Sequence, residues 1–438
     1  MQSLLPRTTT LLAAAEGTIW IPWPRLWLPQ PGYGEPFSSS IINLLDIGDK
    51  IHLSATCKSY RNQLLPENFT TIRFTSDEVS EASALAAVEA YGQYTKAIEF
   101  TCQCDHQESP APTEPSLPPT ACEVLKGLLT PNLHTVRLKF DFNLDDDEPD
   151  VYVYFDFEEN ADQVRFYERS YKWRALMNET WEALVTNTSM RELILNELPP
   201  KQTSAYSTDV FRQFLSQLES ATFHIFGGED YAGLRLTITS GGQDFFERLD
   251  DSFFHHMRRL KHLHIQASDI IGNDYYIPFP LKSESLPLLQ SLKLENFFIS
   301  SELVSFIQGH AQVLRSLHLN ECFSDEYLSW AEFFDQVYKA KPSLAELVYG
   351  HNKAPFMTKE IERWVRDKSV LQRVRQRLKA YATLNVFRQG GFDPDEGRLY
   401  FEEDIDVMRF NQGDDERAYF RLMELVNDNK AEAKFDSR

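Results

Sequence analysis

The chain has 438 residues, 42% of them hydrophobic and 13% aromatic, and a formal charge of −21 at pH 7. This length allows about two to four domains, and the composition is that of an ordinary folded protein, which excludes wholesale disorder. The strong negative charge repels phosphate groups, so we expect no binding to nucleic acid and no binding to membranes.

The sequence offers no targeting or membrane signal. No run approaches the ~18 apolar residues that a transmembrane helix needs. The apolar stretch 11–15 is short for a secretory signal core of ~7–15 residues. Five cysteines, an odd number without regular spacing, suit a reducing compartment. We therefore expect a cytoplasmic or nuclear protein.

Residues 1–36 show neither helical periodicity nor capping signals. They hold Trp20, Trp23 and Trp27 and five prolines between Pro22 and Pro36. The segment is either a disordered arm or an incorrect start of the chain, and it is left out of the predicted fold.

Residues 37–66 have the apolar spacing of short helices. Gly48 and Asp49 interrupt the pattern, and Asp49 is suited to cap a second helix. A segment this short buries little apolar surface alone, so it needs the next domain or a partner for stability.

Residues 45–61 read LDIGDKIHLSATCKSYR. Leu-Asp, two spacers, Asp, alternating apolar residues and Thr-Cys-Lys-x-aromatic-Arg resemble the middle and end of an F-box. The whole chain also resembles F-box leucine-rich-repeat proteins of the filamentous-fungal type. The usual Leu-Pro-x-Glu-apolar opening of that family is replaced here by YGEPF at 33–37, in which only Phe37 matches.

The resemblance implies a three-helix module that docks on the Skp adaptor, and through it on the cullin, of an SCF-type ubiquitin ligase. Six residues would contact the adaptor: Ile41, Leu45, Ile51, Leu53, Cys57 and Tyr60. The chain would then be the substrate-recognition subunit of the ligase, with no catalytic residue of its own. The alternative is a protein-interaction scaffold that has lost adaptor binding.

From residue 68 to residue 352 a unit recurs that consists of a capped helix and a short strand reading L-x-x-L-x-L. The clearest copies are Leu260-Leu263-Ile265, Leu289-Leu292-Leu294, Leu314-Leu317-Leu319 and Leu344-Leu347-Tyr349, with starts 29, 25 and 30 residues apart. That spacing is close to the leucine-rich-repeat period of ~20–29 residues. Looser copies are Thr95-Ile98-Phe100, Leu133-Val136-Leu138, Met190-Leu193-Leu195 and Leu218-Ala221-Phe223.

Because strands and helices alternate, the pattern predicts an α/β fold: an irregular leucine-rich-repeat solenoid with a parallel curved sheet and outer helices. Helix starts are predicted from capping boxes at Thr75 with Glu78 and at Thr120 with Glu123. Thr208, Ser300 and Ser324 are further predicted N-caps.

Two insertions interrupt the early repeats. Residues 105–119 are rich in Pro and Ser and are predicted to form a loop. Residues 141–162 contain the acidic run 145–148, but the glycine and terminal glutamate of an EF-hand are missing. A solvated acidic loop is favoured over a calcium site.

Catalytic and nucleotide-binding motifs are absent from the sequence, so we expect no enzymatic activity and no cofactor. Cys102, Cys104 and His106 form C-x-C-x-H, and Cys122 follows. Zinc sites usually have C-x(2–4)-C spacing and four ligands, so ordinary thiols are favoured and no metal is expected.

The strand residue between the last two apolar positions faces solvent on the concave side of the sheet. Read along the repeats, that column is Arg137, Ile194, His224, His264, Lys293, His318 and Val348, with Lys139 and His262 beside it. We predict that Arg137, Lys139, His262, His264, Lys293 and His318 bind an acidic or phosphorylated target. The alternative is that these are ordinary polar positions on exposed strands.

Residues 353–438 are predicted to cap the solenoid. A long basic helix over 358–388 carries Arg363, Arg366, Lys368, Arg373, Arg375, Arg377 and Lys379. An acidic tail follows with Glu402, Glu403, Asp404, Asp406, Asp414, Asp415 and Glu416. Charge pairing between helix and tail is favoured over a membrane or nucleic-acid surface.

Overall fold

The structure, a computed structural model, describes residues 42, 44–104, 115–142, 158–227, 239–272, 277–351, 354–381, 383–393 and 398–436. The predicted N-terminal arm 1–36, residues 105–114 of the first insertion and residues 143–157 of the acidic insertion lie outside this part of the chain.

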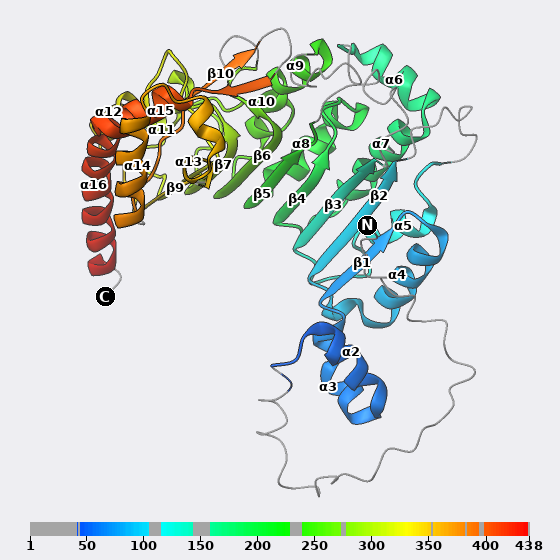
Figure 1. Ribbon diagram of the computed structural model, residues 1–438. Helices are drawn as coiled ribbons and strands as arrows, with labels where there is room; N and C mark the ends of the chain where they lie inside the picture. The colour runs from blue at the N-terminus through cyan, green and yellow to red at the C-terminus, as the bar shows by residue number, and fades with distance from the viewer. Residues whose placement is uncertain are drawn as a thin grey trace, which may run out of the picture.

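The main element is a parallel sheet of nine strands that follow one another in chain order. Figure 1 shows this sheet as an arch, with β1 and β9 at its two ends. Its strands are β1 (Thr71–Thr75), β2 (Ala97–Cys104), β3 (Thr135–Phe142), β4 (Glu192–Leu198), β5 (Ser220–Ile225), β6 (His262–Ile271), β7 (Ser291–Phe297), β8 (Ser316–Asn320) and β9 (Glu346–Gly350). The predicted parallel α/β arrangement is therefore confirmed.

The eight predicted L-x-x-L-x-L motifs coincide with β2 to β9. Their last two apolar residues point into the core; Leu292 and Leu294 of β7, for example, are both fully buried. Strand β1 was not predicted, because its sequence TIRFT has only Ile72 and Phe74 at core positions and no preceding leucine.

Helices connect the strands and pack on the outer side of the arch (Figure 1). They are α4 (Glu78–Tyr91), η1 (Gly92–Tyr94), α5 (Pro119–Leu125), α6 (Ala161–Ser170), α7 (Lys172–Leu184), η3 (Ser204–Ser207), α8 (Asp209–Ser216), α9 (Ser240–Glu247), α10 (Leu249–Ser252), η5 (Phe254–His256), α11 (Ser301–Gly309) and α12 (Trp330–Lys339). The longer ones turn an apolar face to the core, as Phe333, Phe334 and Val337 of α12 do, whereas α6 buries only Val164 and packs on α7.

The predicted N-caps Thr208 and Ser300 are confirmed, since each side chain accepts a hydrogen bond from a backbone N–H of the first turn. Three others are wrong. Asp77, rather than Thr75, caps α4, and Thr120 lies inside α5, which has no side-chain cap. Ser324 forms a bridge to Gln389, and Ser329 caps α12 in a capping box with Glu332. Before α4 and α12, a short polar side chain a few residues ahead of the true cap offers the same sequence signal.

Near the carboxyl ends of β4, β7 and β8, a non-glycine residue adopts the left-handed region, two positions after the last motif leucine. The residues are Glu197, Asn296 and Glu321, with φ of 56°, 63° and 46°. The residue that follows each of them, Leu198, Phe297 or Cys322, is fully buried. This backbone turn therefore sends the chain from the sheet back into the core at equivalent places.

Glu197→Val is expected to destabilise the protein by about 1–2 kcal/mol, because a β-branched side chain tolerates a positive φ poorly. Glu197→Asn should stay within about 0.5 kcal/mol of the parent, since Asn adopts this conformation readily. Urea unfolding of both variants measures the difference. Equal stabilities would show that the turn is not strained.

Two antiparallel helices, α2 (Ile47–Thr56) and α3 (Lys58–Asn68), precede the sheet and lie below β1 in Figure 1. The predicted break at Gly48 and Asp49 is wrong. Asp46 caps α2 by accepting a hydrogen bond from the N–H of Asp49 at 2.8 Å, so both residues lie inside the helix. The cap one turn earlier extends the helix over the glycine.

The C-terminal part contains α13 (Ala354–Met357), η6 (Glu360–Arg363), α14 (Lys368–Ala380), β10 (Gly390–Asp393), β11 (Arg398–Phe401), α15 (Glu403–Gln412) and α16 (Asp414–Asp436). The long helix predicted over 358–388 is wrong. Asp367 accepts hydrogen bonds from the N–H groups of Ser369 and Val370, and this cap starts α14 ten residues later.

Pairing between the basic helix and the acidic tail is confirmed at Arg366–Asp404, 3.6 Å, and at Arg377–Glu416, 2.7 Å. Helix α16 also packs against α12. The side chain of Asp415 accepts from the N–H of Ala331 at 2.8 Å. The amide of Asn429 donates to the carbonyls of Pro342 and Leu344, just before β9. The tail therefore closes the β9 end of the arch.

A buried polar network joins β9 to this C-terminal part. Arg388 Nε donates to Asp406 Oδ2 at 2.6 Å, and both side chains are almost fully buried. The N–H of Gln389 donates to Asp406 Oδ1, also at 2.6 Å, and Arg388 Nη1 lies 3.2 Å from His351 Nε2. Burial raises the pKa of Asp406 to about 7 against the pull of Arg388, and burial together with Arg388 lowers the pKa of His351 to about 3.

Across the described ranges, none of the helices has both the length and the apolar character that crossing a bilayer requires.

Candidate functional site

The α2–α3 hairpin carries the residues of the F-box-like pattern, and it buries very little. No residue of α2 is buried, and in α3 only Leu64 is. Ile47 is 47% exposed and Leu44 is 86% exposed. Lys50 of α2 pairs with Glu67 of α3 at 2.6 Å, so a surface ion pair helps to hold the two helices together.

Of the six predicted adaptor-contact residues, Leu45, Ile51, Leu53 and Tyr60 are half-buried and Cys57 is exposed. Ile41 lies outside the described residues. Leu44 and Ile47 are exposed as well. Part of the apolar surface of the hairpin is therefore left uncovered by the rest of the described chain. Exposed apolar groups on a small, well-formed module are typical of a docking surface.

The strand register defines the central row of the concave face. It runs through Arg73, Glu99, Arg137, Ile194, Thr222, His264, Lys293, His318 and Val348. The predicted placement of His224 in this row is wrong, because Thr222 occupies it and His224 pairs with Gln266 in the next row. Lys139 and His262 lie on opposite sides of the central row rather than in one flanking column.

The structure brings a carboxylate to most of the predicted cations. Glu99 pairs with Arg73 at 2.6 Å and with Arg137 at 2.5 Å, and Lys139 pairs with Asp141 at 2.8 Å. These contacts run along or between neighbouring strands. The charge of this half of the concave face is therefore largely compensated within the protein.

In the other half of the concave face, carboxylates also lie against the predicted cations. Glu295 pairs with Lys293 and lies 3.2 Å from Nε2 of His264, while Glu346 lies 3.2 Å from Nε2 of His318. Burial, and then the Lys293 ammonium, hold the pKa of His264 below its ordinary value. His264 is consequently neutral near pH 7 and adds no charge to the row.

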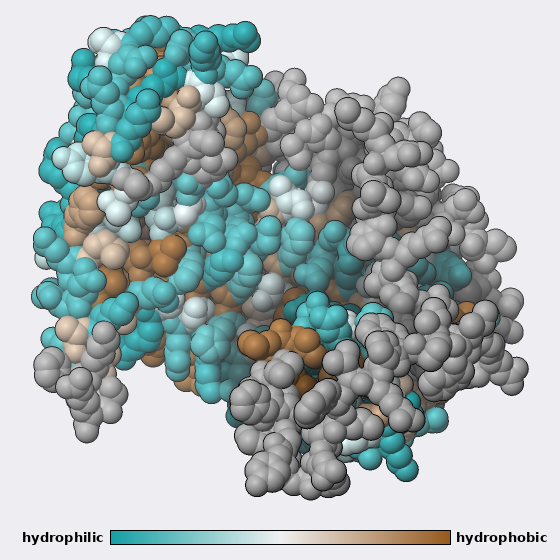
Figure 2. Space-filling model, turned by 60° about the horizontal axis from the view of Figure 1, so that its bottom comes forward, coloured by the Kyte–Doolittle hydropathy of each residue, from teal (hydrophilic) through white to brown (hydrophobic). Residues whose placement is uncertain are grey.

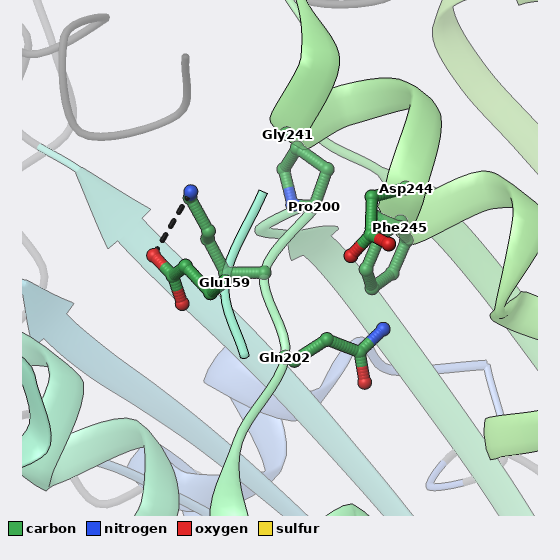
Figure 3. A pocket seen from close by; sticks show the side chains of 7 residues that line it. Glu159, Pro200, Gln202, Gly241, Asp244 and Phe245 are labelled. Carbon is green, nitrogen blue, oxygen red and sulfur yellow. Dashed lines mark ion pairs between the residues drawn. The ribbon is translucent and has the colours of Figure 1, made fainter. Parts of the chain in front are cut away.

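A pocket opens at the carboxyl end of β4 and is lined by Glu159, Pro200, Lys201, Gln202, Gly241, Asp244 and Phe245 (Figure 3). Its volume, including space open to solvent, is about 170 Å³, which is below the ~300–1,000 Å³ of typical ligand sites. Motif reading did not find it, since its residues come from three separate connections and share no pattern.

Charge pairing closes one wall of this pocket. Glu159 binds Arg174 through two hydrogen bonds of 2.7 and 2.8 Å and lies 3.0 Å from Lys201, and all three side chains are nearly inaccessible. Burial alone would raise the pKa of Glu159, but the two cations outweigh burial and lower it. The triad fixes the start of α6 against the β4 rim, which is a structural role.

Cys102 and Cys104 are both buried on the core side of β2, with their sulfur atoms 3.9 Å apart. The hydrogen bond from Cys102, together with burial, raises the pKa of Cys104 well above its usual range, so its thiol stays protonated. His106 lies outside the described residues. Within the described ranges, no group of three or more His, Cys, Asp or Glu side chains is arranged to hold a metal ion.

The face that the arch turns downward in Figure 1 is brought forward in Figure 2. Figure 2 shows a surface that is mainly hydrophilic and is interrupted by small hydrophobic groups. The part of this face that is coloured in Figure 2 is therefore a mixed polar surface rather than an apolar groove.

Comparisons with known proteins add little to this description. No protein-family model and no curated protein matches the chain. A solved structure of L-ribulose 3-epimerase aligns with 81% of this chain and 97% of its own at 12% identity, with a TM-score of 0.17. A likeness at that score supports no argument about fold or function.

Proposed function

We propose that this chain is an F-box leucine-rich-repeat protein that acts as the substrate-recognition subunit of an SCF-type ubiquitin ligase. The α2–α3 hairpin binds the Skp adaptor, and the arch, as an irregular leucine-rich-repeat solenoid, holds the target protein. The ligase chemistry belongs to other subunits, so the role of this chain is binding and not catalysis.

The observation that carries the proposal is the hairpin itself. It presents most of the F-box-like sequence 45–61 on two short helices, in which only Leu64 is buried. Two helices of 10 and 11 residues that bury so little gain stability from a partner that covers their apolar side chains. A dedicated adaptor supplies such a cover.

The arch supports the second half of the proposal. Its nine strands follow chain order with L-x-x-L-x-L at β2 to β9, which is the arrangement expected of leucine-rich repeats. We propose its concave face, with Arg137, Lys139, His262, His264, Lys293 and His318, as part of the target site. The internal ion pairs mean that a target must exchange partners with these side chains, so recognition there is specific rather than strong.

One observation favours the alternative, a protein-interaction scaffold without a ligase. The opening Leu-Pro-x-Glu of the F-box pattern is replaced by YGEP at 33–36. A scaffold would keep the arch and lose the adaptor.

Ile51→Asp and Leu53→Asp are expected to abolish co-purification with the Skp adaptor. Each places a charge at a half-buried apolar position of α2, where a docked partner would desolvate it. The measurement is affinity capture of the purified chain with recombinant adaptor. Ala55→Asp is the matched control, because Ala55 is an exposed residue of the same helix and its variant should still bind.

A thermal melt of each variant separates lost binding from lost folding, since the arch should melt unchanged. Failure of the unmodified chain to capture adaptor, under conditions in which other F-box proteins do, would refute the ligase role and leave the scaffold. Equal loss in Ala55→Asp would show that the hairpin tolerates no charge and that the docking face is misassigned.

A further inference from the structure

A line of residues at the beginning of the strands forms one edge of the arch. At one position before each of β1 to β8, from Thr70 to Arg315, the backbone carbonyl accepts hydrogen bonds from two consecutive N–H groups at the start of the next strand. The carbonyl of Lys96, for example, accepts from His134 and Thr135 at 3.0 and 3.1 Å. The residues of the line are Thr70, Lys96, His134, Arg191, Glu219, Lys261, Gln290, Arg315 and Ala345. They are direct neighbours, spaced about 4.8 Å apart.

We call this edge the lower rim and define it by the five residues before each of β2 to β9. These are 92–96, 130–134, 187–191, 215–219, 257–261, 286–290, 311–315 and 341–345. They contain seven cations (Lys96, Arg191, Arg258, Arg259, Lys261, Arg315 and Lys341) and one acid, Glu219. The whole chain has 44 Lys and Arg against 65 Asp and Glu, so the lower rim reverses the balance of the protein.

Most of these cations are not compensated by a carboxylate. Glu219 pairs with Lys261 at 2.7 Å and lies 3.9 Å from Arg259. Arg191 and Arg315 instead donate to backbone carbonyls, although Arg191, after Lys261 and Arg259, also contributes to lowering the pKa of Glu219.

In the described part of the chain, neither of these two arginines nor Lys96, Arg258 and Lys341 forms an ion pair. The concave row, by contrast, has a carboxylate against nearly every cation. The free positive charge of the arch is therefore on its edge and not in its hollow.

We propose that the lower rim is a docking surface for an extended acidic segment of a partner protein. Four of the cations, Lys96, Arg191, Lys261 and Arg315, lie on the line at every second strand, about 9.6 Å apart, which is close to the ~10 Å between every third residue of an extended chain. Lys96, Arg191 and Arg315 would each gain a carboxylate that does not pair with them in the described chain. Lys96, His134 and Arg191 are consecutive along the line, and Lys261 and Arg315 continue it beyond Glu219.

An acidic protein segment fits better than a nucleic acid. The protein's net charge of −21 repels a ligand more strongly the more negative charges that ligand carries. A long nucleic acid is therefore repelled more than a short acidic peptide. Tyr94 is the one aromatic residue of the lower rim, and it is half-buried, so bases have no platform on which to stack. Glu219 in the middle of the line also suits a segment of mixed charge better than a uniform phosphate backbone.

The inference rests on the proposed function only in taking the arch as the part that holds a target. The test needs no adaptor, so failure here and failure of adaptor docking are distinguishable. The probe is a fluorescein-labelled peptide of about twelve residues with Glu at every third position, whose extended length of about 40 Å matches eight strand steps. Its binding to the full chain is measured by fluorescence anisotropy at low and at high salt.

The test variant is Lys96→Glu/Arg258→Glu/Arg315→Glu. Its control is Lys359→Glu/Arg363→Glu/Lys379→Glu in the C-terminal part, where all three side chains are exposed. Three reversals of two charges each take either variant from −21 to −27, so the long-range field is matched. A third variant, Lys293→Glu/His318→Glu, tests the concave row.

The Kd of the peptide is expected to rise about tenfold or more in the lower-rim variant and less than about twofold in the C-terminal control. Added salt should weaken binding to the unmodified chain. Equal losses in both triple variants would overturn the proposal, because net charge alone would then explain binding. Loss confined to the concave variant would move the site to the hollow, and no saturable binding to the unmodified chain would end the proposal. Equally tight binding of a thymidine oligonucleotide of the same length would identify a nucleic-acid surface instead.

Discussion

Leu292→Ala and Leu317→Ala are each expected to reduce the free energy of unfolding by about 2–5 kcal/mol. Both leucines are fully buried between the sheet and its outer helices, so truncation leaves a cavity in a closely packed core. Lys293→Ala and His318→Ala, at the next positions of the same strands, should stay within about 0.5 kcal/mol of the parent. Urea unfolding of the four variants measures the contrast.

The comparison is demanding because inner and outer residues are adjacent in the sequence. Leu292 and Lys293 are neighbours in β7, and Leu317 and His318 are neighbours in β8. The backbone conformation and the strand are therefore the same for both members of each pair. Similar losses at inner and outer positions would contradict the strand register. A large loss at Lys293 alone would indicate that its pairing with Glu295 is structural.

His351→Gln and Asp406→Asn are expected to change the pH dependence of stability in opposite directions. The pKa of His351 lies at about 3 in the folded protein against an ordinary value of 6.5. Between these values the unfolded chain binds a proton that the folded chain does not, so this group lowers stability as pH falls. The pKa of Asp406 lies at about 7 against an ordinary 3.8, so in the folded chain it binds the extra proton and raises stability as pH falls.

In the unmodified protein the two slopes oppose each other between pH ~4 and pH ~6.5, each with a limit of about 1.4 kcal/mol per pH unit. His351→Gln leaves the Asp406 contribution, and its stability should rise on acidification relative to the parent. Asp406→Asn leaves the His351 contribution, and its stability should fall. Urea unfolding at several pH values gives both profiles.

All other titrating groups are common to the two variants, so the difference between their profiles reports on Asp406 and on His351 with both of its neighbours, Arg388 and Glu321, whose carboxylate lies 2.7 Å from Nδ1 of His351. The double variant His351→Gln/Asp406→Asn is the control and should restore a profile close to that of the parent. Parallel profiles for the two single variants would show that neither group titrates differently in the folded and unfolded chains.

Much of the sheet was predictable because the motif ties local periodicity to a core. In L-x-x-L-x-L the spacing alone separates inner from outer positions, and eight of the nine strands followed from it. The error at His224 arose where the motif weakens to Leu218-Ala221-Phe223. The residue between Ala221 and Phe223 is Thr222, so the motif rule itself gives Thr222, and His224 lies one position beyond the motif.

The pairing of the concave cations with carboxylates was partly predictable from the sequence. Glu99 occupies the central row by the same motif rule that placed Arg137 there, and the two pair across adjacent strands. Glu346 lies one row away from His318, and its carboxylate reaches the imidazole only because of the side-chain conformation. The spacing of the sequence motif does not predict that conformation.

The C-terminal network could not have been predicted. Asp406 lies 18 residues after Arg388, His351 lies 37 residues before it, and the three follow no common period. Their meeting depends on how β10, α15 and the end of β9 pack, which is tertiary information. Adaptor docking by the hairpin remains a prediction, since a partner's contact leaves no trace in a single chain beyond uncovered apolar side chains.

The sheet order has a consequence for how the chain is made. Each strand pairs with strands adjacent in the sequence, so the contacts that build the arch are local and their loop-closure cost is small. A nascent chain emerging from the ribosome can therefore add strands one at a time, without waiting for its C-terminus. The final step differs, because α16 must fold back onto α12, where the side chain of Asp415 binds the N–H of Ala331, 84 residues earlier in the chain. The β9 end of the sheet stays uncovered until α16 has been made.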